Sequence, residues 1–315
     1  MKIAFLFPGQ GAQYVGMGED LYEKYKEIQE LYNLAQKETG INVAEISFKD
    51  ETEKLNQTKF TQICMVTMSL GILEVLKQSN IKAEMVAGLS LGEYVALNYA
   101  ESISTKDTLK IIQKRGKFMQ DLAPKGDWAM VAVLGLSDQD VETACKKVTN
   151  GFAVPANYNC PGQVVVSGNR NGITELTEIA KEMGAKRVLE LKTSGPFHTE
   201  KLKDASIELK KELEKIELST PKVKVIKNID AIPYKENENM KEILSKHVMS
   251  PVKFSDSIKY MLDNGIDTFV EIGPGKVLTS LVKKINKEVK CINISDVNSL
   301  EKALEELKDI EEWIV

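Results

Sequence analysis

The chain has 315 residues, of which 43% are apolar and 28% charged, a composition typical of soluble globular proteins. Its 42 basic and 46 acidic residues give a net charge of −4, which argues against a mainly electrostatic nucleic-acid binder. Its apolar runs fall short of the ~18 residues that cross a membrane, and the stretch at 3–7 is too short for a signal peptide. We therefore expect a protein without a membrane span, long enough for more than one subdomain.

Strands and helices alternate over the first 124 residues. We predict short apolar strands at 2–7 and 85–87, and helices at 20–39, 61–78, 91–99 and 105–122. The helix at 20–39 places its apolar side chains on one face and stops at Gly40. This alternation favours a mostly parallel α/β sheet.

The pattern changes after residue 124. The next strands and helices are predicted at 128–136, 138–148, 152–155, 164–167, 171–184 and 187–191. Their βαββαβ order is that of a ferredoxin-like unit. We therefore predict a small subdomain at 125–195, inserted into a larger α/β domain made of residues 1–124 and 196–315. The second part of that domain is predicted to hold strands at 223–226, 268–272 and 291–294 and a final helix from 300 to about 311.

Cysteine and histidine usage narrows the chemistry. The chain has only two histidines, and its cysteines, which form no CxxC pair, are Cys64, Cys145, Cys160 and Cys291. Neither a structural zinc site nor a disulfide framework is expected, and a reduced, cytoplasmic compartment fits best. Only three of the 42 basic residues are arginines, so the position of each arginine is informative.

The strongest local signal is Gly88-Leu-Ser-Leu-Gly92, a GxSxG sequence between a short buried strand and an apolar helix. That context is the one a nucleophile elbow requires: a sharp turn that exposes the serine hydroxyl above a helix N-terminus. Glycines on either side let the neighbouring chain approach closely. A Gly-Ser turn that merely begins a helix is the alternative, but the strand–turn–helix context favours Ser90 as a nucleophile.

A serine nucleophile needs a base, and the two histidines are the candidates. His198 lies at a loop-to-helix junction, where functional groups are often displayed, whereas His247 lies late in an amphipathic helix. We predict His198 as the base. No acidic residue between Ser90 and His198 stands in a recognisable loop after a strand, so a Ser–His dyad is supported no worse than a triad.

Arg115 shares its helical face with apolar residues at 111, 112, 119 and 122. A buried guanidinium is costly without an anion, and it grips a carboxylate through two parallel hydrogen bonds. The partner is either a protein carboxylate or the carboxylate of a ligand, unless the side chain snorkels to the surface. The sequence leaves these alternatives open.

Two glycine-rich turns follow predicted strands. Residues 7–13 match neither the Walker nor the dinucleotide-binding pattern. They are interpreted as a tight loop with exposed N–H groups that could serve an oxyanion hole, or simply as a turn. Residues 273–276 are interpreted as a turn that starts a helix.

Six short segments stand in a specific order over nearly the whole chain. They are Phe7-Pro-Gly-Gln-Gly-Ala-Gln13, Gly88-Leu-Ser-Leu-Gly-Glu93, Arg115-Gly-Lys-Phe-Met-Gln120, Asn159-Cys-Pro-Gly-Gln-Val-Val-Val-Ser-Gly168, Gly195-Pro-Phe-His198 and Glu271-Ile-Gly-Pro-Gly-Lys276. Together they resemble the malonyl-CoA:acyl carrier protein transacylases of fatty acid synthesis and the related acyltransferase domains of polyketide synthases. Each segment alone is weak evidence, but the ordered set is highly specific.

This resemblance implies a hydrolase-like α/β core, with a mostly parallel sheet, that carries an inserted ferredoxin-like subdomain. It implies that Ser90 is the nucleophile, that His198 is the base and that Arg115 binds the free carboxylate of the malonyl group. The main-chain N–H groups of Gln10 and Leu91 would form the oxyanion hole, where losing one donor typically costs ~2.7–4 kcal/mol of transition-state stabilisation.

The resemblance also assigns substrate-site positions and reveals two departures. Phe197, Asn157 and His247 fall in the expected substrate site, and Phe197 resembles the malonyl-selecting version of the family rather than the methylmalonyl version. The family usually has histidine where this chain has Leu89, which we expect to change a wall rather than abolish activity. At position 247 the family commonly has glutamine, whose main-chain carbonyl orients the catalytic histidine. His247 keeps that carbonyl and adds a second titratable group.

The resemblance implies ping-pong transfer of malonyl from malonyl-CoA to the phosphopantetheine thiol of acyl carrier protein, supplying fatty acid elongation without a metal or redox cofactor. An acidic carrier protein would bind a lysine patch near the cleft. We expect a cytoplasmic monomer that binds no nucleic acid. The alternatives are a trans-acting acyltransferase of a polyketide synthase, a serine thioesterase or hydrolase with water as acceptor, and a non-catalytic carrier-binding scaffold.

Overall fold

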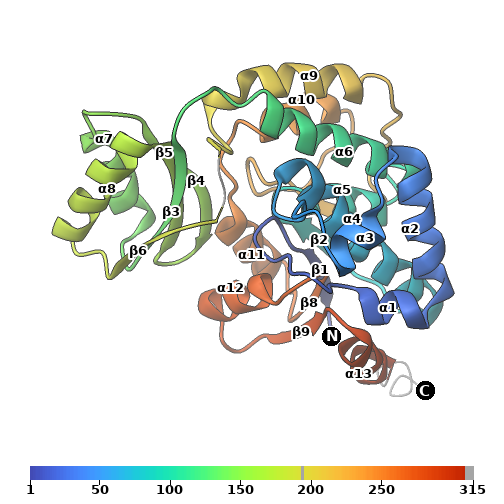
Figure 1. Cartoon of the computed structure of the whole chain (residues 1–315). Coiled ribbons are helices and arrows are strands. Elements are labelled where there is room, and N and C mark those ends of the chain that lie inside the picture. The colour runs from blue at the N-terminus through green and yellow to red at the C-terminus, as the bar shows by residue number, and fades with distance from the viewer. Residues whose placement is uncertain (193–194, 309–315) are drawn as a thin grey trace.

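Two sheets organise the protein (Figure 1). The structure is a computed structural model that describes residues 1–192 and 195–308. In Figure 1 the smaller, four-stranded sheet with its two helices projects to one side of a larger α/β body. The predicted fold class, a mostly parallel α/β core with an antiparallel α+β unit, is confirmed.

The larger sheet is parallel throughout, in the order β7-β2-β1-β8-β9. Its strands are β1 (Ile3–Phe7), β2 (Met85–Gly88), β7 (Lys224–Ile226), β8 (Thr268–Ile272) and β9 (Lys290–Ile294). Every residue of β1 and β8 is buried, as expected for a parallel sheet covered on both faces. Phe7 pairs with Gly88 and Leu6 with Glu271, so the loops after β1, β2 and β8 leave the sheet at the same edge.

Helices cover the two faces of this sheet. Phe5 and Phe7 pack into the apolar cluster that includes α4 and α5, whereas Leu6, on the opposite face, packs with α11 and α12. The helices around the sheet are α1 (Glu19–Lys24), α2 (Lys26–Thr39), α3 (Val43–Phe48), α4 (Thr58–Leu76), α5 (Gly92–Tyr99), α6 (Thr105–Asp121), α9 (Lys203–Leu213), α10 (Met240–His247), α11 (Phe254–Asp263), α12 (Val277–Ile285) and α13 (Val297–Lys308), with short 3₁₀ turns at Lys77–Ser79 and Glu200–Leu202.

One helical segment, Thr58–Ser79, is long and apolar enough to cross a membrane by length and composition alone. Its apolar window has a mean hydropathy of 1.4, and 83% of it is buried inside the protein. The apolar character of α4 is therefore accounted for by its central place in the core.

The smaller sheet is antiparallel, in the order β4-β5-β3-β6. It consists of β3 (Trp128–Leu134), β4 (Ala153–Cys160), β5 (Gln163–Asn169) and β6 (Arg187–Glu190), with α7 (Asp138–Lys147) and α8 (Arg170–Glu182). Val131, Val133 and Val166 face these two helices, whereas Met130 and Val165 point the other way, toward the larger body. Alternate residues of one strand therefore serve two different cores.

Most predicted elements are present within a few residues of their expected ends; two differ, and one helix was not predicted. The single helix expected at 20–39 is wrong: Tyr25 adopts an extended conformation (φ −112°, ψ 120°) and separates α1 from α2. Helix α3 was not predicted, and β4 continues to Cys160 beyond the expected end at 155. The final helix begins at Val297, and the predicted residues 309–311 lie outside the described residues. The subdomain boundaries at 125 and 195 stay predictions, and residues 193–194 beside the second boundary also lie outside the described residues.

Candidate active site

The turn between β2 and α5 has the geometry of a nucleophile elbow. A Cβ on Gly88 would come within 1.9 Å of the main-chain carbon of Gly92, and a Cβ on Gly92 within 2.2 Å of the Phe7 carbonyl oxygen. These contacts require glycine at both positions, since strand, turn and helix touch one another there. Ser90 takes the left-handed conformation (φ 56°) that L-residues rarely adopt, and its side chain is 8% exposed.

His198 is hydrogen-bonded to this serine. Its Nε2 lies 2.8 Å from Ser90 Oγ, and its Nδ1 lies 3.1 Å from the carbonyl oxygens of both His247 and Ser250. Because carbonyl oxygens only accept hydrogen bonds, Nδ1 carries the proton and Nε2 is free to accept the Ser90 hydroxyl proton. Burial, followed by the nearby Arg115 charge, lowers the pKa of His198 to about 4, so the imidazole is a neutral base at physiological pH.

Arg115 projects from α6 to the same hydroxyl. Its Nη2 donates to Ser90 Oγ at 3.0 Å and its Nη1 donates to Gln62 Oε1 at 2.8 Å, while the guanidinium lies 5.6 Å from the centre of the Tyr94 ring. The side chain is fully buried, and its Nε has no hydrogen-bond partner in the part of the chain that the structure describes. Burial lowers the pKa of Arg115. Among the described residues no carboxylate forms an ion pair with Arg115, so the salt-bridge alternative for this residue is not realised there.

The predicted oxyanion-hole residues flank the nucleophile. Within the described ranges, the main-chain N–H groups of Gln10 and Leu91 have no acceptor in the protein. Leu91 is the N-cap of α5, where free N–H groups are expected. Gly9 holds the first loop against Leu89, since a Cβ there would lie 2.7 Å from the Leu89 carbonyl oxygen. The two amides therefore belong to adjoining loops at one edge of the sheet.

These residues open onto a cavity of about 630 Å³ between the two sheets. Phe197 and Asn157 line it together with Ser90 and His198, whereas His247 and Arg115 lie behind its surface. Its remaining lining residues are Gly9, Gln10, Gly11, Ala12, Gln13, Asn56, Gln62, Leu89, Leu91, Met119, Met130, Ala132, Asn159, Gln163, Val165, Glu190, Leu191, Lys192, Val277, Leu278 and Leu281. Its volume is in the range of small-molecule sites.

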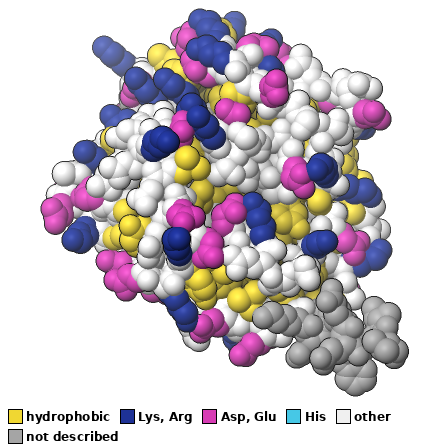
Figure 2. Space-filling model, turned by 90° about the vertical axis from the view of Figure 1, so that its right-hand side faces the viewer, with side chains coloured by type: hydrophobic (Ala, Val, Ile, Leu, Met, Phe, Trp, Pro, Cys, Tyr) yellow, Lys and Arg dark blue, Asp and Glu magenta, His cyan; other side chains and the backbone are white. Residues whose placement is uncertain are grey.

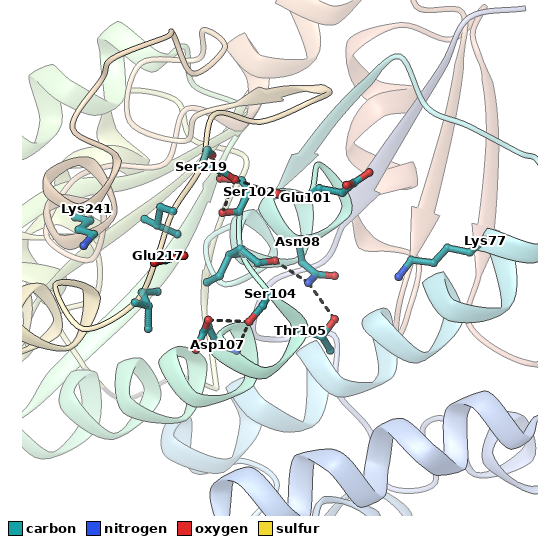
Figure 3. A pocket seen from close by; sticks show the side chains of 13 residues that line it. Lys77, Asn98, Glu101, Ser102, Ser104, Thr105, Asp107, Glu217, Ser219 and Lys241 are labelled. Carbon is teal, nitrogen blue, oxygen red and sulfur yellow. Dashed lines mark hydrogen bonds between the residues drawn. The ribbon is translucent and has the colours of Figure 1, made fainter.

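A second cavity, of about 750 Å³, holds no comparable arrangement (Figure 3). Some of its polar side chains bond to one another: Ser104 donates to Asp107, and Asn98 donates to Thr105. Its lining contains no histidine, so none of its serines is paired with an imidazole. The smaller cavity, which contains Ser90, is therefore the candidate active site.

The sequence analysis missed three polar residues that contact the site. Gln62 accepts a hydrogen bond from Arg115. The sequence feature that could have marked Gln62 is a lone amide in the otherwise apolar helix α4. Glu93 and Asn228 lie behind the elbow. Glu93 belongs to a quoted segment in which it was given no role. Asn228 lies just after the strand predicted at 223–226 and was not singled out, because its sequence neighbours carry no motif. Among the described residues no cluster of three or more His, Cys, Asp or Glu could hold a metal ion.

Comparisons with known proteins show which family the chain resembles. A family model described as "Acyl transferase domain" matches residues 4–310. The malonyl CoA-acyl carrier protein transacylase of Bacillus subtilis (strain 168) is 42% identical over 310 residues, which cover 98% of each chain. The protein of the same name from Staphylococcus aureus (strain MSSA476) is 40% identical over 95% of this chain and 97% of its own.

Solved structures extend the similarity to the fold. The crystal structure of malonyl CoA-acyl carrier protein transacylase from Clostridium perfringens has a TM-score of 0.95 at 40% identity, and the match covers 99% of each chain. A second match is a chain of the structure described as a type II PKS acyl-carrier protein in complex with its malonyl-transacylase. This match has a TM-score of 0.93 at 33% identity and covers 97% of this chain and 100% of that chain. Both sheets therefore fall within the matched regions.

Proposed function

This chain belongs to the acyl transferase family, and we propose that it transfers the malonyl group of malonyl-CoA to the phosphopantetheine thiol of acyl carrier protein through a malonyl-Ser90 intermediate. One observation carries the choice of acyl group. Arg115 is buried without a protein carboxylate among the described residues, 3.0 Å from the hydroxyl of Ser90. A malonyl thioester supplies the missing anion one methylene away from the carbonyl that Ser90 attacks.

In the first half-reaction, Ser90 Oγ attacks the thioester carbonyl as its proton passes to His198 Nε2. The negative charge that develops on the carbonyl oxygen accepts hydrogen bonds from the N–H groups of Gln10 and Leu91. The intermediate collapses by breaking the carbon–sulfur bond, and His198 returns the proton to the departing sulfur. Coenzyme A leaves as the thiol, and the malonyl group remains as an ester on Ser90.

The second half-reaction runs the same steps with the carrier protein. The phosphopantetheine thiol gives its proton to His198 Nε2 and attacks the malonyl ester carbonyl. The carbon–oxygen bond breaks, and Ser90 Oγ recovers the proton. Throughout both steps the carbonyl oxygens of His247 and Ser250 hold the Nδ1–H of His198, which keeps the ring oriented for proton transfer.

Arg115 holds the free carboxylate and thereby orients the acyl group. To accept it, the guanidinium exchanges its hydrogen bond with Ser90 Oγ for one with the ligand, which frees the hydroxyl for attack. Phe197 is 5% exposed, packs beside Gly195 and lines the cavity, where it limits the bulk next to the acyl group. Asn157, tied by a β-bridge to Val252, contributes a polar group to the opposite wall.

Incubation with malonyl-CoA tests this function. Intact-mass measurement should detect a malonyl adduct on the wild-type protein and none on Ser90→Ala, and holo acyl carrier protein should discharge the adduct and carry the malonyl group away. Rapid release of free malonate regardless of acceptor would identify a hydrolase instead. Binding of the carrier without any adduct would leave only the scaffold alternative.

The acyl carrier protein is the expected partner, and the four free cysteines support a reducing, cytoplasmic setting. We propose a monomer that uses no cofactor of its own. On the face shown in Figure 2, basic and acidic side chains are interspersed, so that face gives no reason to place the carrier patch there. A fatty-acid carrier and a polyketide carrier, offered in parallel as acceptors, would separate primary fatty acid synthesis from service to a polyketide synthase.

A further inference from the structure

The side chain of Asn228 bridges the two ends of the nucleophile elbow. Its Oδ1 accepts the Ser90 N–H at 2.8 Å and its Nδ2 donates to the Gly88 carbonyl oxygen at 2.6 Å. Asn228 is 2% exposed and lies 138 residues from Ser90 in sequence, in the segment after β7. We propose that these two contacts, the Asn228 clasp, make Asn228 a positioning residue for the nucleophile.

The clasp is itself rigidly held. The Asn228 N–H donates to Glu93 Oε2 at 3.0 Å, and its carbonyl oxygen accepts the Lys253 N–H at 2.8 Å. Glu93 is 1% exposed and also accepts the hydroxyl proton of Tyr234. Since Glu93 belongs to the first turn of α5, directly after the elbow, the network returns to the element that it supports. Every polar group of Asn228 thus has a partner with a fixed position.

The clasp stabilises a strained backbone. A left-handed conformation is unfavourable at a residue other than glycine, and it persists only where its surroundings fix it. At Ser90 the clasp supplies partners for the amide of the strained residue and for the carbonyl two positions earlier. Without it, the turn can relax and carry the hydroxyl away from His198.

The clasp also decides which amide groups serve the carbonyl oxygen of the substrate. Because the Ser90 N–H donates to Asn228, it is not available to the cavity, whereas the Leu91 N–H finds no acceptor among the described residues. The inference rests on the proposed function for its substrate, but the geometry concerns the reactivity of Ser90 toward any electrophile. Asn228 touches neither the hydroxyl nor, on this reading, the substrate.

The test separates the rate of acylation from substrate binding. In single-turnover experiments with malonyl-CoA, Asn228→Ala should form malonyl-Ser90 about 10- to 100-fold more slowly than wild type, the size of effect expected from a small misplacement of the nucleophile. The affinity for malonyl-CoA, measured in the Ser90→Ala background with and without Asn228→Ala, should change less than about threefold. Asn33→Ala, at an exposed asparagine of α2, is the matched control.

A folded Asn228→Ala protein that acylates at the wild-type rate would overturn the proposal, and so would a loss of affinity as large as the loss of rate. If Asn228→Ala does not fold, Asn228→Asp decides, because it keeps an acceptor for the Ser90 N–H and lacks the donor for Gly88. Slower acylation with unchanged affinity supports the clasp, and a wild-type rate refutes it. If wild type forms no malonyl adduct, the proposed function fails, and labelling of Ser90 by a fluorophosphonate then tests the clasp by the same criteria.

Discussion

The two sheets contribute different kinds of residue to one cavity. At the edge of the parallel sheet, Ser90 lines the cavity from a strained backbone, and the buried acid Glu93 and the buried amide Asn228 lie behind it. The antiparallel sheet lines the same space with the apolar side chains of Met130, Ala132 and Val165 and with the polar side chains of Asn157, Asn159, Gln163 and Glu190. Within the described residues, no hydrogen bond joins these side chains to Ser90 or His198. Loops at the carboxyl ends of parallel strands can bring distant polar residues together, whereas the regular alternation of an antiparallel sheet provides a wall.

This difference suggests that the two sheets have separate roles. Substitutions at the parallel edge should lower the rate of the chemical step, and substitutions in the antiparallel sheet should alter stability or substrate fit. The two sets of residues are separable by experiment because acylation of Ser90 can be measured as a single turnover, apart from binding.

The largest effect in this comparison is expected from the base. His198→Ala removes the acceptor that lies 2.8 Å from Ser90 Oγ, and general-base catalysis typically contributes about 10²- to 10⁴-fold. We expect the single-turnover rate of malonyl-Ser90 formation at neutral pH to fall by that factor. A loss smaller than about tenfold would mean that another group takes the proton. His198 could then no longer be counted among the residues that set the rate of the chemical step.

Arg115→Ala should produce the next largest effect, and a selective one. A hydrogen bond to a charged group contributes about 1.5–3 kcal/mol, which corresponds to roughly 10- to 100-fold in rate. Transfer of malonyl should fall by this factor, whereas transfer of acetyl, which has no free carboxylate, should fall far less. Paired assays with malonyl-CoA and acetyl-CoA measure the ratio, and Arg187→Ala, at an exposed arginine of β6, is the matched control. Equal losses for both acyl groups would contradict the assignment of Arg115 to the free carboxylate.

The pH dependence of Ser90 reactivity reports the protonation of His198, the base at the edge of the parallel sheet. Protonation of His198 removes the base, and burial with the Arg115 charge lowers its pKa to about 4. The rate of Ser90 labelling by a fluorophosphonate should therefore stay flat from pH 8 to about 6 and decline only as the pH approaches 4. Arg115→Ala removes a nearby positive charge, so the acid limb should move to higher pH. A wild-type limb near pH 6.5 would show that the site does not depress this pKa.

Ser90 and His198, at the edge of the parallel sheet, could be predicted from local sequence. The strand–turn–helix context of Ser90 was visible because glycine spacing and apolar runs are local signals, and His198 followed because only two histidines exist. Their contact, across 108 residues, depends on the packing of the whole domain and was not derivable from spacing. The same holds for Asn228, whose side chain reaches the elbow only because β7 pairs with β2 in the folded sheet.

The outer helices show where periodicity is insufficient. The apolar pattern of 20–39 continues through Tyr25, so it predicts one helix, although the backbone is extended at that residue and the chain changes direction. In the antiparallel sheet, β4 runs past its predicted end because its bulged register pairs polar residues, including Asn157, that alternation alone does not mark as strand. At β4, pairing with β5 and not propensity sets the boundary.

The smallest effect on rate is expected within a single strand of the antiparallel sheet. Val166 is fully buried against α7 and α8, and Val165, its neighbour, faces the cavity. Val166→Ala should lower the free energy of unfolding by about 2 kcal/mol, through lost burial and the space left behind, and leave the acylation rate within about twofold. Val165→Ala should instead raise the KM for malonyl-CoA, because it changes the wall that the substrate touches. Urea titrations and acylation rates of the two variants measure both quantities. The opposing result is that Val166→Ala raises the activation free energy of acylation by as much as it lowers the free energy of unfolding. The packing of the antiparallel sheet would then influence Ser90, and the two regions could no longer be treated as separate contributors.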